Sequence, residues 1–99
     1  MDVELFISEV TLYELQMGAT DATKVRDVQL LTESIPVLPL TKDVALKAAE
    51  IYHDLRRRNQ MIEFRDIFIG ATAIIAELPV LTKNKKHFKR IANLTLAAY

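Results

Sequence analysis

The chain has 99 residues, and its mass of 11.3 kDa is that of a single domain covering residues 1–99. Thirteen Lys and Arg residues balance thirteen Asp and Glu residues, which excludes a strongly basic nucleic-acid coat protein and an acidic disordered tail. Cysteine is absent, so disulfide scaffolds, thiolate zinc sites and cysteine nucleophiles are excluded. No apolar run reaches the ~18–20 residues that span a bilayer, and we expect a cytoplasmic protein with no membrane partner.

The charges are unevenly distributed along the chain. Residues 1–34 carry seven acids and two bases, for a net charge of −5, whereas residues 35–99 carry eleven bases and six acids, for +5. Two solvated helix surfaces are the simpler interpretation of this asymmetry. An anion-binding side that faces an acidic side is the alternative.

The first elements are a strand and a helix. The apolar run Leu5–Ile7 predicts a short buried strand. A helix follows, and Thr11 with Glu14 fits a capping box at its start, although Ser8 also qualifies one turn earlier. Gly18 predicts the end of this helix.

The middle of the chain predicts two further helices separated by an extended segment. Asp21 caps a helix running to about Ser34. Residues 35–40 are apolar but contain two prolines, which predicts a strand at a sheet edge. Thr41 caps a long helix that ends near Asn59. The apolar stripes expected on the two helices are Val25, Val28, Leu30 and Leu31, and then Val44, Ala48, Ile51 and Leu55.

The last third of the chain completes an alternation of strands and helices. Residues 63–78 are apolar nearly all round, which predicts a central, buried helix. Residues 79–82 predict a strand, residues 83–90 a basic segment with a short helix, and residues 94–97 a final strand. This order predicts an α/β fold with a mostly parallel sheet that is flanked by helices on both faces.

Three polar residues are candidates for chemistry, although each has a purely structural interpretation. Glu14 fits a capping box, Asp66 lies in a first helical turn where the helix dipole favours a carboxylate, and Asn84 suits a turn after a strand. Asp66 stands out because it leads into an almost wholly apolar helix. Buried carboxylates are rare unless they are paired or bind a cation.

Three segments together carry a resemblance to a known family. Residues 7–18 resemble the part of PIN domains that holds their second acidic residue, and residues 65–74 resemble the helix that holds their third. Residues 79–88 resemble the strand end and turn at their fourth position. The order and the separations agree over essentially the whole chain, and the nearest likeness is to the toxin ribonucleases of VapBC toxin–antitoxin pairs.

The resemblance implies a three-layer PIN-like fold and a metal-dependent endoribonuclease, with RNA as substrate and an antitoxin protein as partner. Carboxylates repel a phosphate, so a hard cation, Mg²⁺ or Mn²⁺, is expected between them, where it activates water. By position, Glu14 and Asp66 are the implied metal ligands, and Thr82 and Asn84 complete the catalytic set.

The basic residues near the implied site have two interpretations. Lys83, Lys85 and Lys86 are candidates for binding the RNA backbone, and a solvated turn is the equal alternative. His87 is interpreted as a packing or surface residue, because no Cys or other His near it suggests a zinc site.

One departure from the family bears on function. PIN domains open with a central strand that ends in an acidic residue, and this chain begins at what corresponds to their second strand. We therefore expect an impaired nuclease, and the alternative is a catalytically silent PIN-like interaction or assembly module. Strand edges left without this neighbour recruit another chain, which predicts a homodimer or a higher oligomer.

Overall fold

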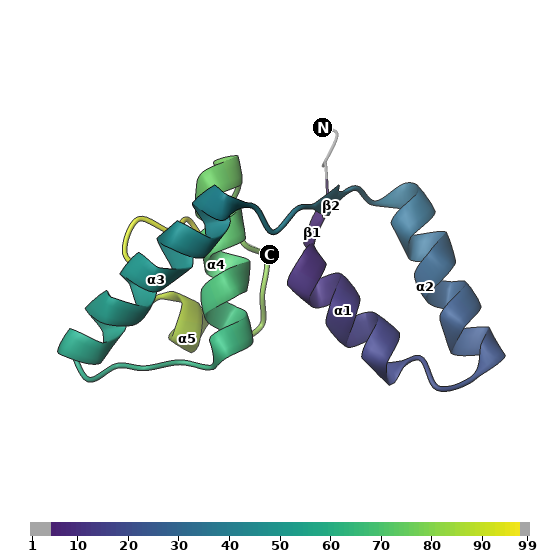
Figure 1. The fold of residues 1–99 in the computed structure, drawn as a ribbon, viewed down its shortest axis with the longest axis horizontal. Coiled ribbons are helices and arrows are strands. Elements are labelled where there is room, and N and C mark those ends of the chain that lie inside the picture. The colour runs from purple at the N-terminus through teal and green to yellow at the C-terminus, as the bar shows by residue number, and fades with distance from the viewer. Residues whose placement is uncertain (1–4, 98–99) are drawn as a thin grey trace. The chain divides into compact units, whose positions relative to one another are not determined.

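The computed structural model describes residues 5–97 of the chain, and its ribbon is drawn in Figure 1. The chain divides into two compact units, one ending at Pro39 and the other beginning at Leu40. The expectation of one domain over residues 1–99 stays a prediction.

The first unit contains a small parallel sheet and two helices. Its elements are β1 (Ile7–Ser8), α1 (Glu9–Gly18), α2 (Ala22–Ser34) and β2 (Val37–Leu38). The two strands run parallel, with Ile7 opposite Val37 and Ser8 opposite Leu38. Both predicted strands therefore exist, but each has only two residues. Prolines on both sides of β2 cannot donate to a ladder, which limits its length.

Side-chain caps set the helix starts in this unit. The Oγ of Ser8 accepts a hydrogen bond from the backbone N of Thr11 at 3.1 Å, so α1 begins at Glu9. The capping box at Thr11 is therefore wrong, and the earlier start at Ser8 is confirmed. Asp21 caps α2 as predicted, with its Oδ1 2.8 Å from the backbone N of Lys24.

The apolar stripe predicted on α2 is mostly exposed. Only Val28 is buried, whereas Val25 is 37% and Leu30 is 49% exposed. A unit of this size has too little chain to cover every apolar side chain of two helices. The prediction is therefore wrong for Val25 and Leu30, whereas Val28 is buried and Leu31 is half-buried.

The second unit is built on two long helices that pack side by side (Figure 1), α3 (Lys42–Arg57) and α4 (Phe64–Ala76), followed by the short α5 (Lys85–Phe88). The Oγ1 of Thr41 caps α3, accepting from the backbone N of Val44 at 3.2 Å. The predicted stripe of α3 is confirmed in full. It packs in one core with Ile62, Ile67, Ala71, Ala73, Val80, Phe88 and Ile91.

Helix α4 is buried on one side only. Its buried face includes Ile67 and Ala71, but Phe64 is 72% and Ile75 is 41% exposed. A Cβ on Gly70 would lie 2.6 Å from the Cδ1 of Ile91, so this glycine permits the close approach of residues 91–94. The predicted central helix therefore exists and has a solvent-facing side.

The two strands predicted in the second unit are reduced to a single parallel bridge between Val80 and Leu96. Val80 donates its backbone N–H to Thr95 O and accepts from Ala97 N, both at 2.9 Å. The parallel α/β character is thus confirmed in a chain dominated by helices. Within residues 5–97, no helix has the length and apolar content to cross a membrane.

Removal of the Thr41 cap is expected to weaken the second unit. We predict that Thr41→Ala lowers the free energy of unfolding by about 1 kcal/mol, within the ~0.5–2 kcal/mol typical of a lost N-cap. The exposed neighbour Lys42 provides the control, and Lys42→Ala is expected to change stability by less than about 0.5 kcal/mol. Urea denaturation followed by circular dichroism measures both, and equal effects would contradict the role of the cap.

Candidate active site around Asp66

Asp66 lies in the first turn of α4. The helix begins at Phe64 after Glu63, and the backbone N–H of Asp66 donates to the carbonyl oxygen of Glu63 at 3.0 Å. A carboxylate near a helix N-terminus is favoured by the helix dipole. Asp66 is nevertheless only 5% exposed, so its charge is held where water hardly reaches it.

The carboxylate of Asp66 has few partners. Within residues 5–97 its Oδ2 has no hydrogen-bond partner, and the Nδ1 of His87 lies 3.8 Å away. Its Oδ1 lies 3.8 Å from the Nε of Arg65, which is also 3.3 Å from Glu63 Oε2. Burial raises the pKa of Asp66 above its usual range, and the charge of Arg65 opposes this shift.

Thr82, Asn84 and His87 form a connected set beside Asp66. The backbone N–H of Asn84 donates to Thr82 Oγ1 at 3.0 Å, which shapes the turn before α5. The Nδ2 of Asn84 lies 2.8 Å from the Nδ1 of His87. The structure therefore links two of the predicted polar residues, through His87, to the carboxylate of Asp66.

Two kinds of contact hold α5 against the start of α4. Phe88 and Ile91 are each 3% exposed in the core of the unit. Arg90 donates from Nη1 to the carbonyl oxygen of Met61 at 3.1 Å, and Arg58 donates from Nη2 to the carbonyl oxygen of Arg90. The loop that leads into α4 is thus tied to the segment that carries Asn84 and His87.

His87 belongs to this site, although sequence reasoning interpreted it as a packing or surface residue. Asn84 and His87 are three residues apart where α5 begins, a spacing that places them on one side of a helical turn. This three-residue spacing is the feature of the sequence from which His87 could have been predicted as a site residue. The approach to Asp66 depends on how α5 packs on α4.

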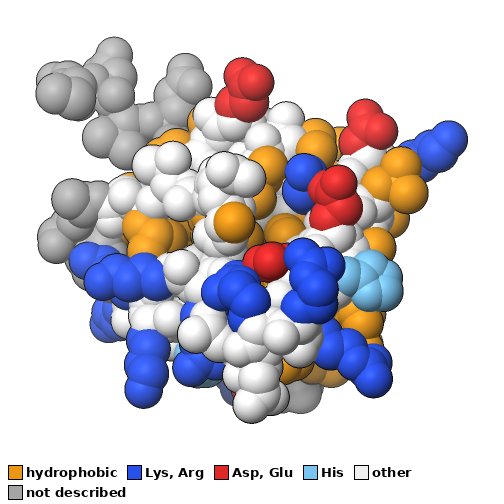
Figure 2. Space-filling model, turned by 90° about the vertical axis from the view of Figure 1, so that its left-hand side faces the viewer, with side chains coloured by type: hydrophobic (Ala, Val, Ile, Leu, Met, Phe, Trp, Pro, Cys, Tyr) orange, Lys and Arg blue, Asp and Glu red, His pale blue; other side chains and the backbone are white. Residues whose placement is uncertain are grey.

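Glu14 lies on α1, in the other unit, and is half-buried. Its convergence with Asp66, to within about 8 Å for two ligands of one hydrated ion, stays a prediction. Lys83 and Lys86 are exposed and Lys85 is half-buried. Figure 2 shows Lys and Arg side chains gathered on the face of the molecule on the α3 side of Figure 1.

Asp66 suits a hard cation. Its buried Oδ2 is an oxygen donor without a hydrogen-bond partner in the described chain, which is what Mg²⁺ and Mn²⁺ require of a ligand. Within residues 40–97, no group of three or more His, Asp or Glu side chains is arranged so that it could hold a metal ion. Asp66 therefore fits a metal ligand, and further oxygen donors are needed to complete a site.

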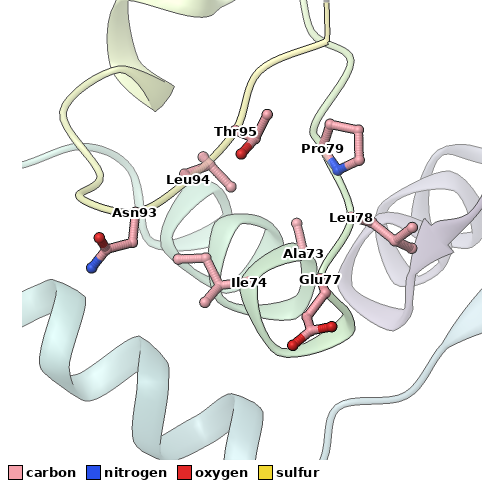
Figure 3. A pocket seen from close by; sticks show the side chains of 8 residues that line it. All are labelled: Ala73, Ile74, Glu77, Leu78, Pro79, Asn93, Leu94 and Thr95. Carbon is pink, nitrogen blue, oxygen red and sulfur yellow. The ribbon is translucent and has the colours of Figure 1, made fainter.

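A separate pocket of about 400 Å³ lies at the other end of α4 (Figure 3). The carboxylate of Glu77 and the amide of Asn93 lie at its edges in Figure 3, and both residues have positive φ angles, 57° and 66°. None of the predicted site residues lines it. Its lining is Ala73, Ile74, Glu77, Leu78, Pro79, Asn93, Leu94 and Thr95.

Comparisons with known proteins agree over nearly the whole chain. Residues 1–94 match the family described as PIN domain. The chain is 30% identical over 93 residues to "Ribonuclease VapC1" of Methanocaldococcus jannaschii, covering 94% of this chain and 68% of that protein. It is 34% identical over 93 residues to "Ribonuclease VapC10" of Mycobacterium tuberculosis, covering 94% and 69%.

Solved structures show the same likeness. VapBC-1 from nontypeable Haemophilus influenzae matches with a TM-score of 0.89 and 28% identity, over 95% of this chain and 73% of that one. DNA-bound VapBC from Salmonella typhimurium matches with a TM-score of 0.87 and 26% identity, over 92% and 72%. Both structures are named VapBC.

Proposed function

Because the chain belongs to the PIN domain family, we propose that it acts as a metal-dependent endoribonuclease, the toxin of a toxin–antitoxin pair. The observation that carries this proposal is the buried carboxylate of Asp66, whose Oδ2 has no hydrogen-bond partner among residues 5–97. Relatives named VapC ribonucleases and structures named VapBC support RNA as the substrate and an antitoxin as the partner.

Asp66 and Glu14 are the proposed ligands of Mg²⁺ or Mn²⁺, of which only Asp66 is supported by its surroundings in the structure. When bound, the metal supplies an activated water and stabilises negative charge on the phosphoryl oxygens. Burial of Asp66 keeps bulk water from its carboxylate and leaves Oδ2 available as a donor. Thr82 fixes the turn from which Asn84 presents its side chain.

The proposal is tested with the purified chain, a 5′-labelled single-stranded RNA and added Mn²⁺ or Mg²⁺. We expect slow endonucleolytic cleavage that stops when EDTA removes the metal. Binding of Mn²⁺, measured by isothermal titration calorimetry without RNA, is the independent readout. Cleavage that persists in excess EDTA would contradict a metal-dependent mechanism.

A catalytically silent interaction module is the second candidate. The observation in its favour is that, within residues 40–97, no group of three His, Asp or Glu side chains could hold a metal ion. This candidate predicts that the chain neither binds Mn²⁺ nor cleaves RNA, even when its antitoxin partner is removed. The same two measurements therefore separate the candidates.

Lys83 and Lys86 are proposed to bind the RNA backbone. Both are exposed. Lys83 comes directly before Asn84, and Lys86 lies within α5. Each phosphate contact to a single strand adds about −0.7 to the slope of log affinity against log salt concentration. We expect Lys83→Ala/Lys86→Ala to reduce the size of that slope by about 1.4, measured by fluorescence anisotropy. Lys42→Ala, at the start of α3, is the matched control and should leave the slope unchanged.

A further inference from the structure

His87 lies between the two polar groups of the site. Its Nδ1 is 2.8 Å from Asn84 Nδ2 and 3.8 Å from Asp66 Oδ2. The first distance is that of a hydrogen bond, and the second is too long for one. A carboxamide nitrogen can only donate, so Nδ1 accepts from Asn84 and the ring carries its proton on Nε2.

We propose that His87 is a positioning residue that fixes the orientation of the Asn84 carboxamide, so that Oδ1 is the end left for a cation or its bound water. The inference rests on the proposed function, because it supposes that a cation binds beside Asp66. An amide NH₂ repels a cation, whereas an amide oxygen is an accepted ligand of Mg²⁺ and Mn²⁺. The hydrogen bond to His87 selects between these two ends.

The same arrangement accounts for the unpartnered oxygen of Asp66. A positively charged imidazole would attract the carboxylate, whose Oδ2 lies 3.8 Å from Nδ1, and would compete with a cation for its charge. With Nδ1 already accepting from Asn84, the imidazole cannot donate to Asp66 from that nitrogen. Oδ2 has no hydrogen-bond partner within residues 5–97, and it stays available to a cation.

The segment that carries His87 is anchored in the core of the second unit. The next residue, Phe88, is 3% exposed in the core. Two residues later, Arg90 is bonded through its side chain to Met61 and through its carbonyl oxygen to Arg58. The backbone that carries His87 is thus fixed by the packing of α5, and the ring itself is oriented by its hydrogen bond with Asn84.

Two substitutions separate the acceptor at position 87 from the shape of the ring. His87→Phe keeps a flat ring without an acceptor, and His87→Gln keeps an acceptor on a flexible side chain. Loss of a group that orients a metal ligand typically costs about 10–100-fold in affinity. We expect His87→Phe to weaken Mn²⁺ binding by about that factor, measured by calorimetry, and His87→Gln to recover part of the loss.

His53 provides the matched control. It is an exposed histidine on α3 whose ring contacts Tyr52 edge-on, and His53→Phe should leave Mn²⁺ affinity unchanged. Wild-type Mn²⁺ affinity in His87→Phe would overturn the inference. If His87→Phe does not fold, the inference is tested by the Mn²⁺ affinity of His87→Gln and by which ring nitrogen of the wild-type His87 carries the proton.

Nitrogen-15 NMR of the metal-free wild-type protein gives a readout that does not depend on metal binding or activity. We expect the correlation pattern of a ring protonated at Nε2, and an altered shift of the Asn84 side-chain NH₂ in His87→Phe. A ring protonated at Nδ1 would overturn the inference. A wild-type protein that binds no Mn²⁺ but shows the Nε2–H ring would instead contradict the proposed function.

Discussion

Asp66→Asn is expected to abolish metal-dependent RNA cleavage, with a loss larger than the about 10–100-fold that follows removal of a group that only orients a ligand. The substitution replaces a buried charged oxygen with a neutral amide of the same size. It removes the negative charge that attracts the cation and leaves the packing around it in place. Cleavage of labelled RNA and calorimetric titration with Mn²⁺ measure the two consequences separately.

The same substitution is expected to stabilise the fold at neutral pH. Burial raises the pKa of Asp66 above its ordinary value of 3.8, which means that the fold favours the protonated form. Protonated Asp66 therefore contributes to the stability of the fold. That contribution is fully present below pH 3.8 and is lost as the pH rises through the raised pKa of Asp66 in the folded state. Asp66→Asn should remove that pH-dependent loss, as followed by thermal unfolding between about pH 3 and pH 7.

An activity loss accompanied by a stability gain separates function from structure. Asp43, an exposed carboxylate in the first turn of α3, is the matched control. Asp43→Asn should leave Mn²⁺ binding and cleavage unchanged. An Asp66→Asn protein that cleaves RNA as the wild type does, or that loses stability at neutral pH, would contradict the role given to Asp66.

The largest effect on stability is expected from Leu55→Ala. Leu55 has an exposed fraction of 0% and lies in the core between α3 and α4. Replacement of a buried leucine by alanine typically costs about 2–5 kcal/mol, against a total stability of about 5–15 kcal/mol for a domain. We therefore expect extensive unfolding at moderate urea concentrations, followed by circular dichroism.

Leu46 lies on the same helix and provides the control, because it is 57% exposed. Leu46→Ala should change the free energy of unfolding by less than about 0.5 kcal/mol. Similar losses for the two variants would mean that the α3 stripe does not form the core of the second unit.

Local features of the sequence were sufficient for most helices. The caps at Asp21 and Thr41 and the period of the α3 stripe are determined by neighbours within one or two turns, and the structure confirms them. The burial of Asp66 also followed from local sequence, because Asp66 lies in the first turn of a helix that is almost wholly apolar. The resemblance to PIN domains likewise lies in three spaced segments of the sequence, and the match of residues 1–94 to that family confirms it.

Contacts between distant segments were decided only by the tertiary structure. The strands predicted over residues 79–82 and 94–97 came down to one bridge, because ladder length depends on how two separated segments align. The stripe predicted on α2 is wrong for Val25 and Leu30, because the period of apolar residues predicts one face of a helix but not what covers that face. His87 joined Asp66 only because α5 packs on the start of α4, since a distance between side chains on separate helices is not encoded in the spacing along either one.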